Sequence, residues 1–352
     1  MMSPASPIRL LAAHAVPSFL DALSRAAAAR CDIELVGTCR DWARAVEMVR
    51  DLRPDVLTLD AALPGMGGPA AVGELISAER QRVVVAATDG CGFASDVVAC
   101  LEAGVVDFAF RRPEHSWTSP VFLAALFHRV RTAASVATES LSPCTVPDLM
   151  PLLKAHPGAV WGMLGDIGAP GTLLQVLPRL EPGFPGCLCI ALSLPGAITR
   201  ALAHYLDARC DYPVREVRPG DAPQPGTAVV LPGNYRVLLK PAYDGSPSFI
   251  LEPRRPGDAV PVLDAALLSF IRHVPTHLVA LSGCETEGMA GVQAVAESGG
   301  CVYTAPRESM LFTQFADGLR SRIAGTREIA PLVVCPVMPA TREIVPIALA
   351  RS

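Results

Sequence analysis

Apolar and polar positions alternate in blocks along the first 134 residues, and each short apolar run precedes a segment of helical periodicity. The apolar runs read IRLLAA, IELVG, DVLTLD, RVVVAAT and VVDFAF. Five strand–helix units in this order predict a parallel sheet with helices on both faces. Functional side chains of such a sheet gather at the carboxyl ends of its strands, where Asp60, Thr88 and Arg111 fall.

A stretch rich in Ser, Thr and Pro follows at 132–158, TAASVATESLSPCTVPDLMPLLKAHPG, and its periodicity is weak. This composition is typical of a linker, in which we expect one short helix at 147–154. The pattern therefore predicts two domains, at 7–134 and 158–350, joined by a linker at 135–157.

Short apolar runs return after the linker: AVWGML, CLCIAL, PVREV, HLVALS and CVYT. Helical segments follow most of them, so we expect a second, larger parallel sheet covered on both faces. Two further runs, TAVVLPG and YRVLL, are separated by a turn and predict a hairpin added to this sheet. The expected fold class is α/β, with two doubly wound parallel-sheet domains.

The composition of the chain limits the classes of molecule that we expect it to bind. The 352 residues are 51% hydrophobic and 18% charged, with a formal net charge of −4, so nothing suggests a basic face for nucleic acid or anionic lipid. No apolar run is long enough to cross a bilayer. Arg9 and His14 interrupt the apolar N-terminal stretch, so we expect no signal peptide. The eleven cysteines form no CxxC pair. We expect a soluble, cytoplasmic protein with buried thiols and no resident metal or cofactor.

The segment VGTCRDWARAVEMVRDLRPDVLTLDAALPGMGG, at 36–68, resembles the middle of a response-regulator receiver domain. The resemblance places Asp60 at the phosphoacceptor position. Receivers hold Mg²⁺ through an acidic pair after the first strand, and here those positions carry Ala13 and His14. A single carboxylate is a poor ligand set for this six-coordinate cation.

Two switch residues of receivers also map ambiguously. The hydroxyl position falls on Ala87 or Thr88, and the lysine position on Arg111 or Arg112. An arginine keeps the charge but has a planar fork in place of a compact ammonium group. Asp60 is then either a phosphorylation switch or, as we favour, a relic carboxylate at a strand end. A less favoured alternative pairs it with His14 as a pH-sensitive couple.

Five segments of the second domain, from Val160 to about Ala324, resemble the catalytic domain of chemotaxis protein-glutamate methylesterases of the CheB type. In order they are GDIGAPGTLLQVLPRL, IALSLPGAITRALAHYLD, PGTAVVLPG, LSGCETEGMAGVQAVAESGG and TAPRESMLFTQF. The resemblance implies ester hydrolysis by a serine, a histidine and an aspartate. Those three positions carry Asp166, Ser193 and Glu287 in this chain.

Each of the three changes removes or shifts part of the reaction. Asp166 cannot be acylated and released by the serine route, and the hydroxyl of Ser193 is too weak a base near neutral pH. Glu287 keeps the charge of an aspartate but moves it by a methylene. The paired glycines after the family's serine have become Gly168 and Ala169, and Ala169 fits only with ordinary backbone dihedrals.

Other residues could take over the chemistry. Asp166, Glu285 and Glu287 could gather with Ser193 into an oxygen-rich cluster for a divalent cation, although carboxylates solvated at a crevice rim are the favoured interpretation. Cys284 is a candidate nucleophile, but no histidine falls at a matching position. We expect His204 and His277 to be packing or hydrogen-bonded residues, and His156 to belong to the linker.

We weigh three functions and favour the first. The first is a pseudoenzyme that binds or scaffolds chemosensory proteins, with receptor tails or a histidine kinase as partners implied by the resemblance. The second is a living methylesterase, glutamine deamidase or other hydrolase with relocated catalytic residues. The third is a sensor of a small ligand in the old crevice.

Overall fold

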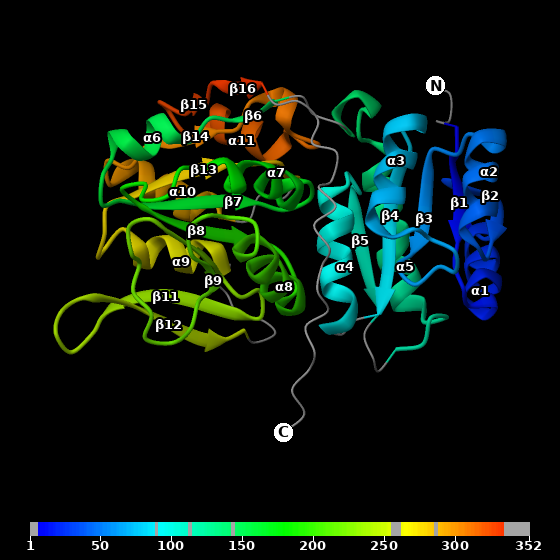
Figure 1. The fold of residues 1–352 in the computed structure, drawn as a ribbon, viewed down its shortest axis with the longest axis horizontal. Helices are drawn as coiled ribbons and strands as arrows, with labels where there is room; N and C mark the ends of the chain where they lie inside the picture. The colour runs from blue at the N-terminus through cyan, green and yellow to red at the C-terminus, as the bar shows by residue number, and fades with distance from the viewer. Residues whose placement is uncertain are drawn as a thin grey trace.

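The computed structural model describes residues 6–88, 91–111, 115–141, 145–254, 262–284 and 288–333. Two parallel sheets lie side by side, each between layers of helices (Figure 1). The N-terminal sheet has five strands and the C-terminal sheet has seven. The predicted α/β class with two doubly wound sheets is confirmed.

The N-terminal sheet has the order β2-β1-β3-β4-β5, with every pairing parallel. Its order reverses between β1 and β3, so a crevice opens where those two strands end. The strands are β1 Ile8–Ala13, β2 Ile33–Cys39, β3 Val56–Asp60, β4 Arg82–Thr88 and β5 Asp107–Arg111. The helices are α1 Pro17–Ala28, α2 Trp42–Leu52, α3 Gly68–Glu79, α4 Cys91–Glu102 and α5 Pro120–Ala134.

Local sequence explains these elements. The run VLTLD of β3 is buried at every position, as expected for a central strand with helices on both faces. Asp41 caps α2 by accepting the backbone N–H of Arg44, and Arg53 ends that helix in the left-handed conformation. On α5, Phe122, Leu126 and Val130 recur at helical spacing and are buried against the sheet.

The connecting segment contains three short elements: η1 Thr138–Leu141, β6 Thr145–Pro147 and α6 Met150–Ala155. The helix expected at 147–154 therefore begins later, because Pro147 belongs to β6. That strand pairs antiparallel with β16, Pro331–Val333, so the segment is tied to the far end of the described chain.

The C-terminal sheet has the order β15-β14-β13-β7-β8-β10-β9, again all parallel. The chain leaves β7 toward β8 and later returns on the other side at β13, so the crevice lies where β7 and β13 end. The strands are β7 Val160–Gly165, β8 Cys187–Leu192, β9 Val214–Glu216, β10 Thr227–Val230, β13 Thr276–Ala280, β14 Val302–Thr304 and β15 Arg327–Glu328. The helices are α7 Ala169–Val176, η2 Leu177–Arg179, α8 Gly196–Asp207, α9 Val262–Phe270, α10 Met289–Glu297, η3 Arg307–Ser309 and α11 Gln314–Arg322.

The predicted hairpin of TAVVLPG with YRVLL is wrong. The first run forms β10, which is buried throughout and lies in the sheet between β8 and β9. The second run forms β11, Tyr235–Pro241, which pairs antiparallel with β12, Pro247–Pro253. Asp244 and Gly245 stand in the turn of this ribbon, and Gly245 has φ +81°, which glycine adopts without strain.

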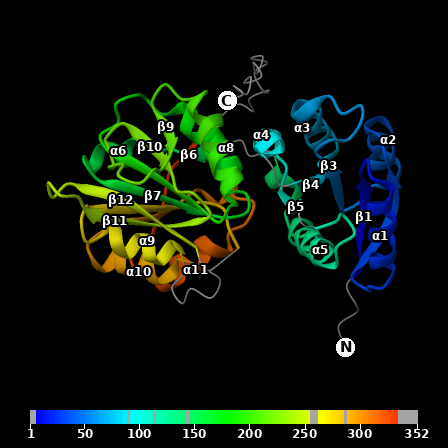
Figure 2. The same cartoon turned by 90° about the horizontal axis from the view of Figure 1, so that it is seen from below.

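The two sheets meet through helices. Both views place α4 of the first domain beside α8 of the second (Figures 1 and 2). Glu102 at the end of α4 accepts a hydrogen bond from the Tyr205 hydroxyl at 2.5 Å and pairs with Arg209 at 3.3 Å. No helix among the described residues is both long and apolar enough to cross a lipid bilayer.

Candidate functional site

The first candidate site lies where β1 and β3 end side by side. Asp60 closes β3 and is only 6% exposed. One carboxylate oxygen accepts the N–H of Ala15 at 3.0 Å, and the other accepts the N–H of Ala62 at 2.9 Å. Both oxygens of Asp60 are therefore hydrogen-bonded to backbone of the surrounding loops.

His14 fills the position beside this carboxylate. Its Nδ1 accepts the N–H of Val16 at 3.1 Å, so the neutral ring carries its proton on Nε2. The distance of 3.4 Å from Nδ1 to Asp60 is then a contact between two acceptors and not a hydrogen bond. Burial lowers the pKa of His14 to about 4, although the charge of Asp60 acts in the opposite direction.

Aromatic rings enclose the imidazole. The ring of Phe19 lies 4.3 Å from His14 and that of Trp117 lies 4.4 Å away, centre to centre. Nε2 of His14 is buried and has no hydrogen-bond partner within the described part of the chain. The Mg²⁺ site of a receiver does not fit here, because the side chains beside Asp60 are a methyl group, at Ala13, and a neutral ring.

The two switch positions of the first domain lie next to each other. Thr88 ends β4 and Arg111 ends β5, in register with it. The guanidinium of Arg111 donates to the Thr88 hydroxyl at 3.3 Å and to the carbonyl of His115 at 2.5 Å. It also lies 5.0 Å from the ring of Trp117, so this indole contacts both Arg111 and His14. Arg112 lies outside the described residues.

The second candidate site is the glycine turn after β7. Gly168 has φ +84°, and a Cβ there would lie 2.5 Å from the hydroxyl of Ser282. Ala169 is the first residue of α7 and has ordinary backbone dihedrals, so the alanine fits where the family has a glycine. Ser282 holds the turn by donating to the carbonyl of Ile167 at 2.7 Å and accepting the N–H of Phe312 at 3.0 Å.

Asp166 occupies the tip of this turn and is 8% exposed. Its Oδ1 accepts the N–H of Ile167 at 2.6 Å and the N–H of Cys284 at 2.9 Å. Its own N–H donates to the carbonyl of Ser282, two residues after β13. The carboxylate therefore accepts backbone N–H groups from the segments after β7 and β13. Backbone N–H groups of this kind hold an oxyanion in acyl transfer.

Ser193 lies one residue beyond β8, which pairs with β7, the strand before Asp166. Its N–H donates to the carbonyl of Gly165 at 3.4 Å, and its side chain is exposed. Cys284 is half-buried in the loop after β13. The third predicted position, Glu287, lies outside the described residues, as does Glu285, and so does the predicted cluster of these two carboxylates with Asp166.

The chain has seven histidines, and all of them fall within the described ranges. Three of them, His14, His115 and His128, belong to the first domain. His156 follows α6, His204 is in the last turn of α8, His273 follows α9, and His277 is the second residue of β13. None of the seven stands at the carboxyl end of β7, β8 or β13, where a base for Asp166, Ser193 or Cys284 would be expected.

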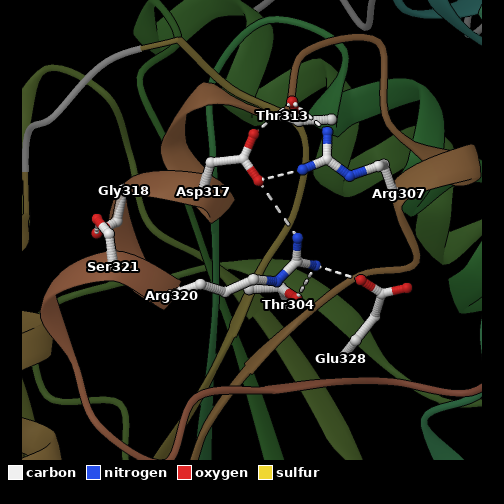
Figure 3. Close-up of polar contacts among 8 residues, drawn as sticks. All are labelled: Thr304, Arg307, Thr313, Asp317, Gly318, Arg320, Ser321 and Glu328. Atoms are coloured by element: carbon white, nitrogen blue, oxygen red, sulfur yellow. Dashed lines mark hydrogen bonds and ion pairs between the residues drawn. The ribbon is translucent and has the colours of Figure 1, made fainter.

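A network of ion pairs lies near the end of β14 (Figure 3). Asp317 on α11 accepts from Arg307 at 2.5 Å and from Arg320 at 3.3 Å. Arg320 also donates to Thr304 at 2.6 Å and pairs with Glu328 of β15. The two guanidiniums and two carboxylates balance in charge, so the network pins the loop after β14 to α11 and β15.

The first domain covers one side of the glycine turn. A cavity of about 30 Å³, room for about one water molecule, lies between the domains. Leu101 and Gly104 line it from the first domain, and Gly168, Thr172 and Leu311 line it from the second. The helix that follows the glycine turn, α7, therefore packs against α4 and the residues after it.

Sequence reasoning did not find the aromatic enclosure of His14 or the donors to Asp166. Phe19 and Trp117 come from α1 and from the loop after β5, and nothing in their spacing indicates that they meet. The Cys284 donor is a backbone group, so its residue type carries no signal. The proximity of Thr88 to Arg111, in contrast, follows from their places at the ends of adjacent strands.

Comparisons with known proteins match both halves of the chain. Residues 162–331 match the CheB methylesterase family, and residues 16–113 match the response regulator receiver domain. A protein-glutamate methylesterase/protein-glutamine glutaminase of Myxococcus xanthus is 31% identical over 319 residues, which cover 88% of this chain and 90% of the relative. The corresponding protein of Thermotoga maritima is 27% identical over 285 residues, 79% of this chain and 82% of the relative.

A solved structure, the CheB methylesterase catalytic domain of Thermotoga maritima, is similar at 24% identity and a TM-score of 0.44. It covers 49% of this chain and 94% of that domain. The family assignment rests on the sequence relatives, since the Myxococcus protein aligns over 90% of its own length. The chain belongs to the CheB-type family of chemotaxis response regulators, in which a receiver domain precedes a protein-glutamate methylesterase domain.

Proposed function

We propose that this chain is a catalytically inactive member of its family and serves as a binding or scaffolding element in a chemosensory system. The proposal rests on the position and hydrogen bonds of Asp166. This residue stands where the resemblance places the nucleophilic serine, and its carboxylate is hydrogen-bonded to the backbone of Ile167 and Cys284.

Ester cleavage on this scaffold requires an alcohol or thiol next to a base. A carboxylate held by two N–H donors is a weakened nucleophile, because those hydrogen bonds stabilise its charge. The neighbouring Ser193 offers a hydroxyl of negligible basicity. Because no imidazole lies at the described ends of β7, β8 and β13, the crevice lacks the proton acceptor on which the family chemistry depends.

The receiver half supports the same conclusion. Phosphoryl transfer to Asp60 would require a cation to neutralise the charge of the incoming phosphate. Both oxygens of Asp60 accept backbone N–H groups, and the cation position is filled by His14 within an aromatic enclosure. We therefore propose that Asp60 has a structural role and that the receiver is not switched by phosphorylation.

Turnover of a methylated chemoreceptor peptide tests the enzymatic part. The purified full chain should release no methanol above the blank, while the Myxococcus xanthus relative serves as the positive control. Turnover that disappears on Asp166→Ala, Ser193→Ala or Glu287→Ala would contradict the proposal. For the receiver, intact-mass measurement after acetyl phosphate treatment with Mg²⁺ should show no added phosphoryl group.

The binding part requires its own experiment. Purified cytoplasmic tails of chemoreceptors and a chemosensory histidine kinase are the partners that the family implies. Calorimetric titration of the full chain with each should give saturable binding to at least one of them, and the Asp166→Ala variant should bind equally well. Failure of both partners to bind would remove the scaffolding role while leaving the loss of catalysis standing.

A second candidate is a hydrolase with relocated catalytic residues. One observation favours it: Sγ of Cys301 lies 3.8 Å from Nε2 of His156, a thiol beside an imidazole. The pair stands at the amino ends of the sheet, however, and not at the crevice between β7 and β13. Any turnover that Cys301→Ser abolishes would support this candidate, whereas turnover lost on Cys284→Ser would place the nucleophile in the crevice.

A further inference from the structure

A cluster of metal-ligating side chains lies at the end of the C-terminal sheet opposite Asp166. It consists of His156, His277 and Cys301, whose ligand atoms all lie within 4.8 Å of one another. His156 directly follows α6, His277 lies near the start of β13, and Cys301 directly precedes β14. Both views show α6 on the side of this sheet that faces away from the first domain (Figures 1 and 2).

The contacts within the cluster are close. Sγ of Cys301 lies 3.8 Å from Nε2 of His156, and the two imidazole rings are 4.2 Å apart, centre to centre. Ligand atoms around one Zn²⁺ ion are about 3.2 to 3.6 Å apart when the bonds are about 2.0 Å to nitrogen and about 2.3 Å to sulfur. The thiol and the His156 ring therefore need to approach each other by only a few tenths of an ångström.

We propose that Cys301, His156 and His277 form a binding site for a borderline-soft divalent cation of the Zn²⁺ type. Thiolate and imidazole ligands select this class of ion over Mg²⁺ and Ca²⁺, which prefer oxygen. Binding forms a Cys301 Sγ–metal bond and releases the thiol proton to solvent. Solvent supplies the fourth ligand of the tetrahedral site, because Cys301 and His156 are both half-buried and not sealed off.

The three ligands are not equivalent. Nδ1 of His277 accepts the N–H of Cys301 at 2.9 Å, so coordination through this nitrogen must displace that hydrogen bond. Cys301 and His156 are thus the anchoring ligands, and His277 is the third. The ring of His277 is held in place by Trp161, 4.9 Å away centre to centre, which limits how far this ligand can turn.

The position of the site indicates what the ion would do. It would join the end of α6 to the starts of β13 and β14, which otherwise meet here through a thiol–imidazole contact. The segment before β7 connects the two domains, so the ion would fix this connection to the C-terminal sheet. The site lies across the sheet from the crevice, and its role would be structural.

Titration of the full chain with Co²⁺, a spectroscopic substitute for Zn²⁺, tests the proposal. A phosphine reductant keeps the thiols reduced. The wild type should show a thiolate-to-cobalt charge-transfer band that one equivalent of Zn²⁺ removes. Cys301→Ser should lose the band, and His156→Gln should weaken Co²⁺ binding at least tenfold. Cys31→Ser is the matched control, because Cys31 is exposed and distant in sequence from the cluster, and it should keep the band.

A second measurement separates loss of the site from loss of the fold. Zn²⁺ should raise the melting temperature of the wild type and of Cys31→Ser but not that of Cys301→Ser. Circular dichroism of each variant checks that it is folded. A wild type without the band, a band that survives in Cys301→Ser, or equal Co²⁺ affinity in His156→Gln would each overturn the assignment.

Discussion

Two carboxylates occupy equivalent places in the two sheets of this molecule. Asp60 ends β3 beside β1, and Asp166 follows β7 beside β13, in both cases where the strand order reverses. Each carboxylate accepts a backbone N–H from the loop of the neighbouring strand, from Ala15 and from Cys284 respectively. Each also accepts an N–H from its own turn.

The two sites differ in what has changed around the carboxylate. Asp60 is the residue that the family expects, but a neutral histidine and aromatic rings have replaced its acidic neighbours. At the second site the reactive residue itself has been exchanged for Asp166, while the glycine turn around it remains. The comparison teaches that a carboxylate at such a crevice can be kept for its hydrogen bonds to backbone, independently of any reaction.

The largest expected effect comes from restoring the second site. Asp166→Ser combined with Ser193→His returns a nucleophile and a base to neighbouring strand ends, where Gly165 and Leu192 are in register. We expect the double variant to hydrolyse a methylated receptor peptide about 1,000-fold faster than the uncatalysed blank, whereas the wild type and each single variant stay at the blank rate.

The measurement is methanol release at pH 7.5, with a circular dichroism spectrum of each variant to show that it is folded. A double variant no faster than the single variants would mean that the loss extends beyond these two positions. In that case the second site has lost its surroundings, as the first has, in addition to its reactive group.

Acid should destabilise the first site. In the folded chain the pKa of His14 is about 4, below the ordinary value of 6.5, because the ring is buried. Between these values the unfolded chain binds more protons, so the free energy of unfolding should fall by up to about 3 kcal/mol as the pH drops from 6.5 to 4, and then level off. Urea unfolding at pH 7, 5.5 and 4.5 with a chelator present measures this change.

The His14→Asn variant is the decisive comparison, since its amide oxygen can still accept the N–H of Val16 but does not titrate. It should be less sensitive to acid than the wild type. A second contribution remains in it, because burial and the nearby His156 also lower the pKa of His277 to about 4. His128→Asn, an exposed change on α5, should leave the pH dependence as it is. Equal acid sensitivity of all three chains would contradict the role of His14.

Asp60→Asn should destabilise the receiver by about 2 kcal/mol at pH 7. The reason is that both carboxylate oxygens accept N–H groups, from Ala15 and Ala62, and an asparagine must turn its own NH₂ toward one of them. Urea unfolding of the variant and the wild type gives the difference. A variant as stable as the wild type would show that one of these two hydrogen bonds contributes little.

Much of the fold could be predicted because its central strands are buried on both faces. Runs such as VLTLD in β3 and CLCIAL in β8 are apolar throughout and stand out in the sequence. The prediction mispaired the ribbon of β11 and β12, because its alternation is irregular; the turn signal lies in the dipeptide Asp244–Gly245. That dipeptide is a strong indication of a hairpin.

The sequence predicts where the two sites lie in the fold, but not the contacts that their residues make. Strand ends of a parallel sheet indicate where Asp60 and Asp166 lie, since the topology brings those ends together. Their partners come from loops: Trp117 from the loop after β5, and the N–H of Cys284 from the loop after β13. Loop conformation leaves no periodic signal, so these contacts became visible only in three dimensions.

The smallest effect concerns the position where the glycine turn of the second site meets α7. Ala169→Gly should reduce stability by about 1 kcal/mol, because a fully buried methyl group is lost and the backbone gains freedom in the unfolded chain. Gly168→Ala should cost more, since φ is +84° and the new Cβ would lie 2.5 Å from the Ser282 hydroxyl. If Ala169→Gly instead stabilised the chain, the alanine would be a strained remnant of the family's glycine pair. The second site would then resemble the first, in which the surroundings have changed as well as the chemistry.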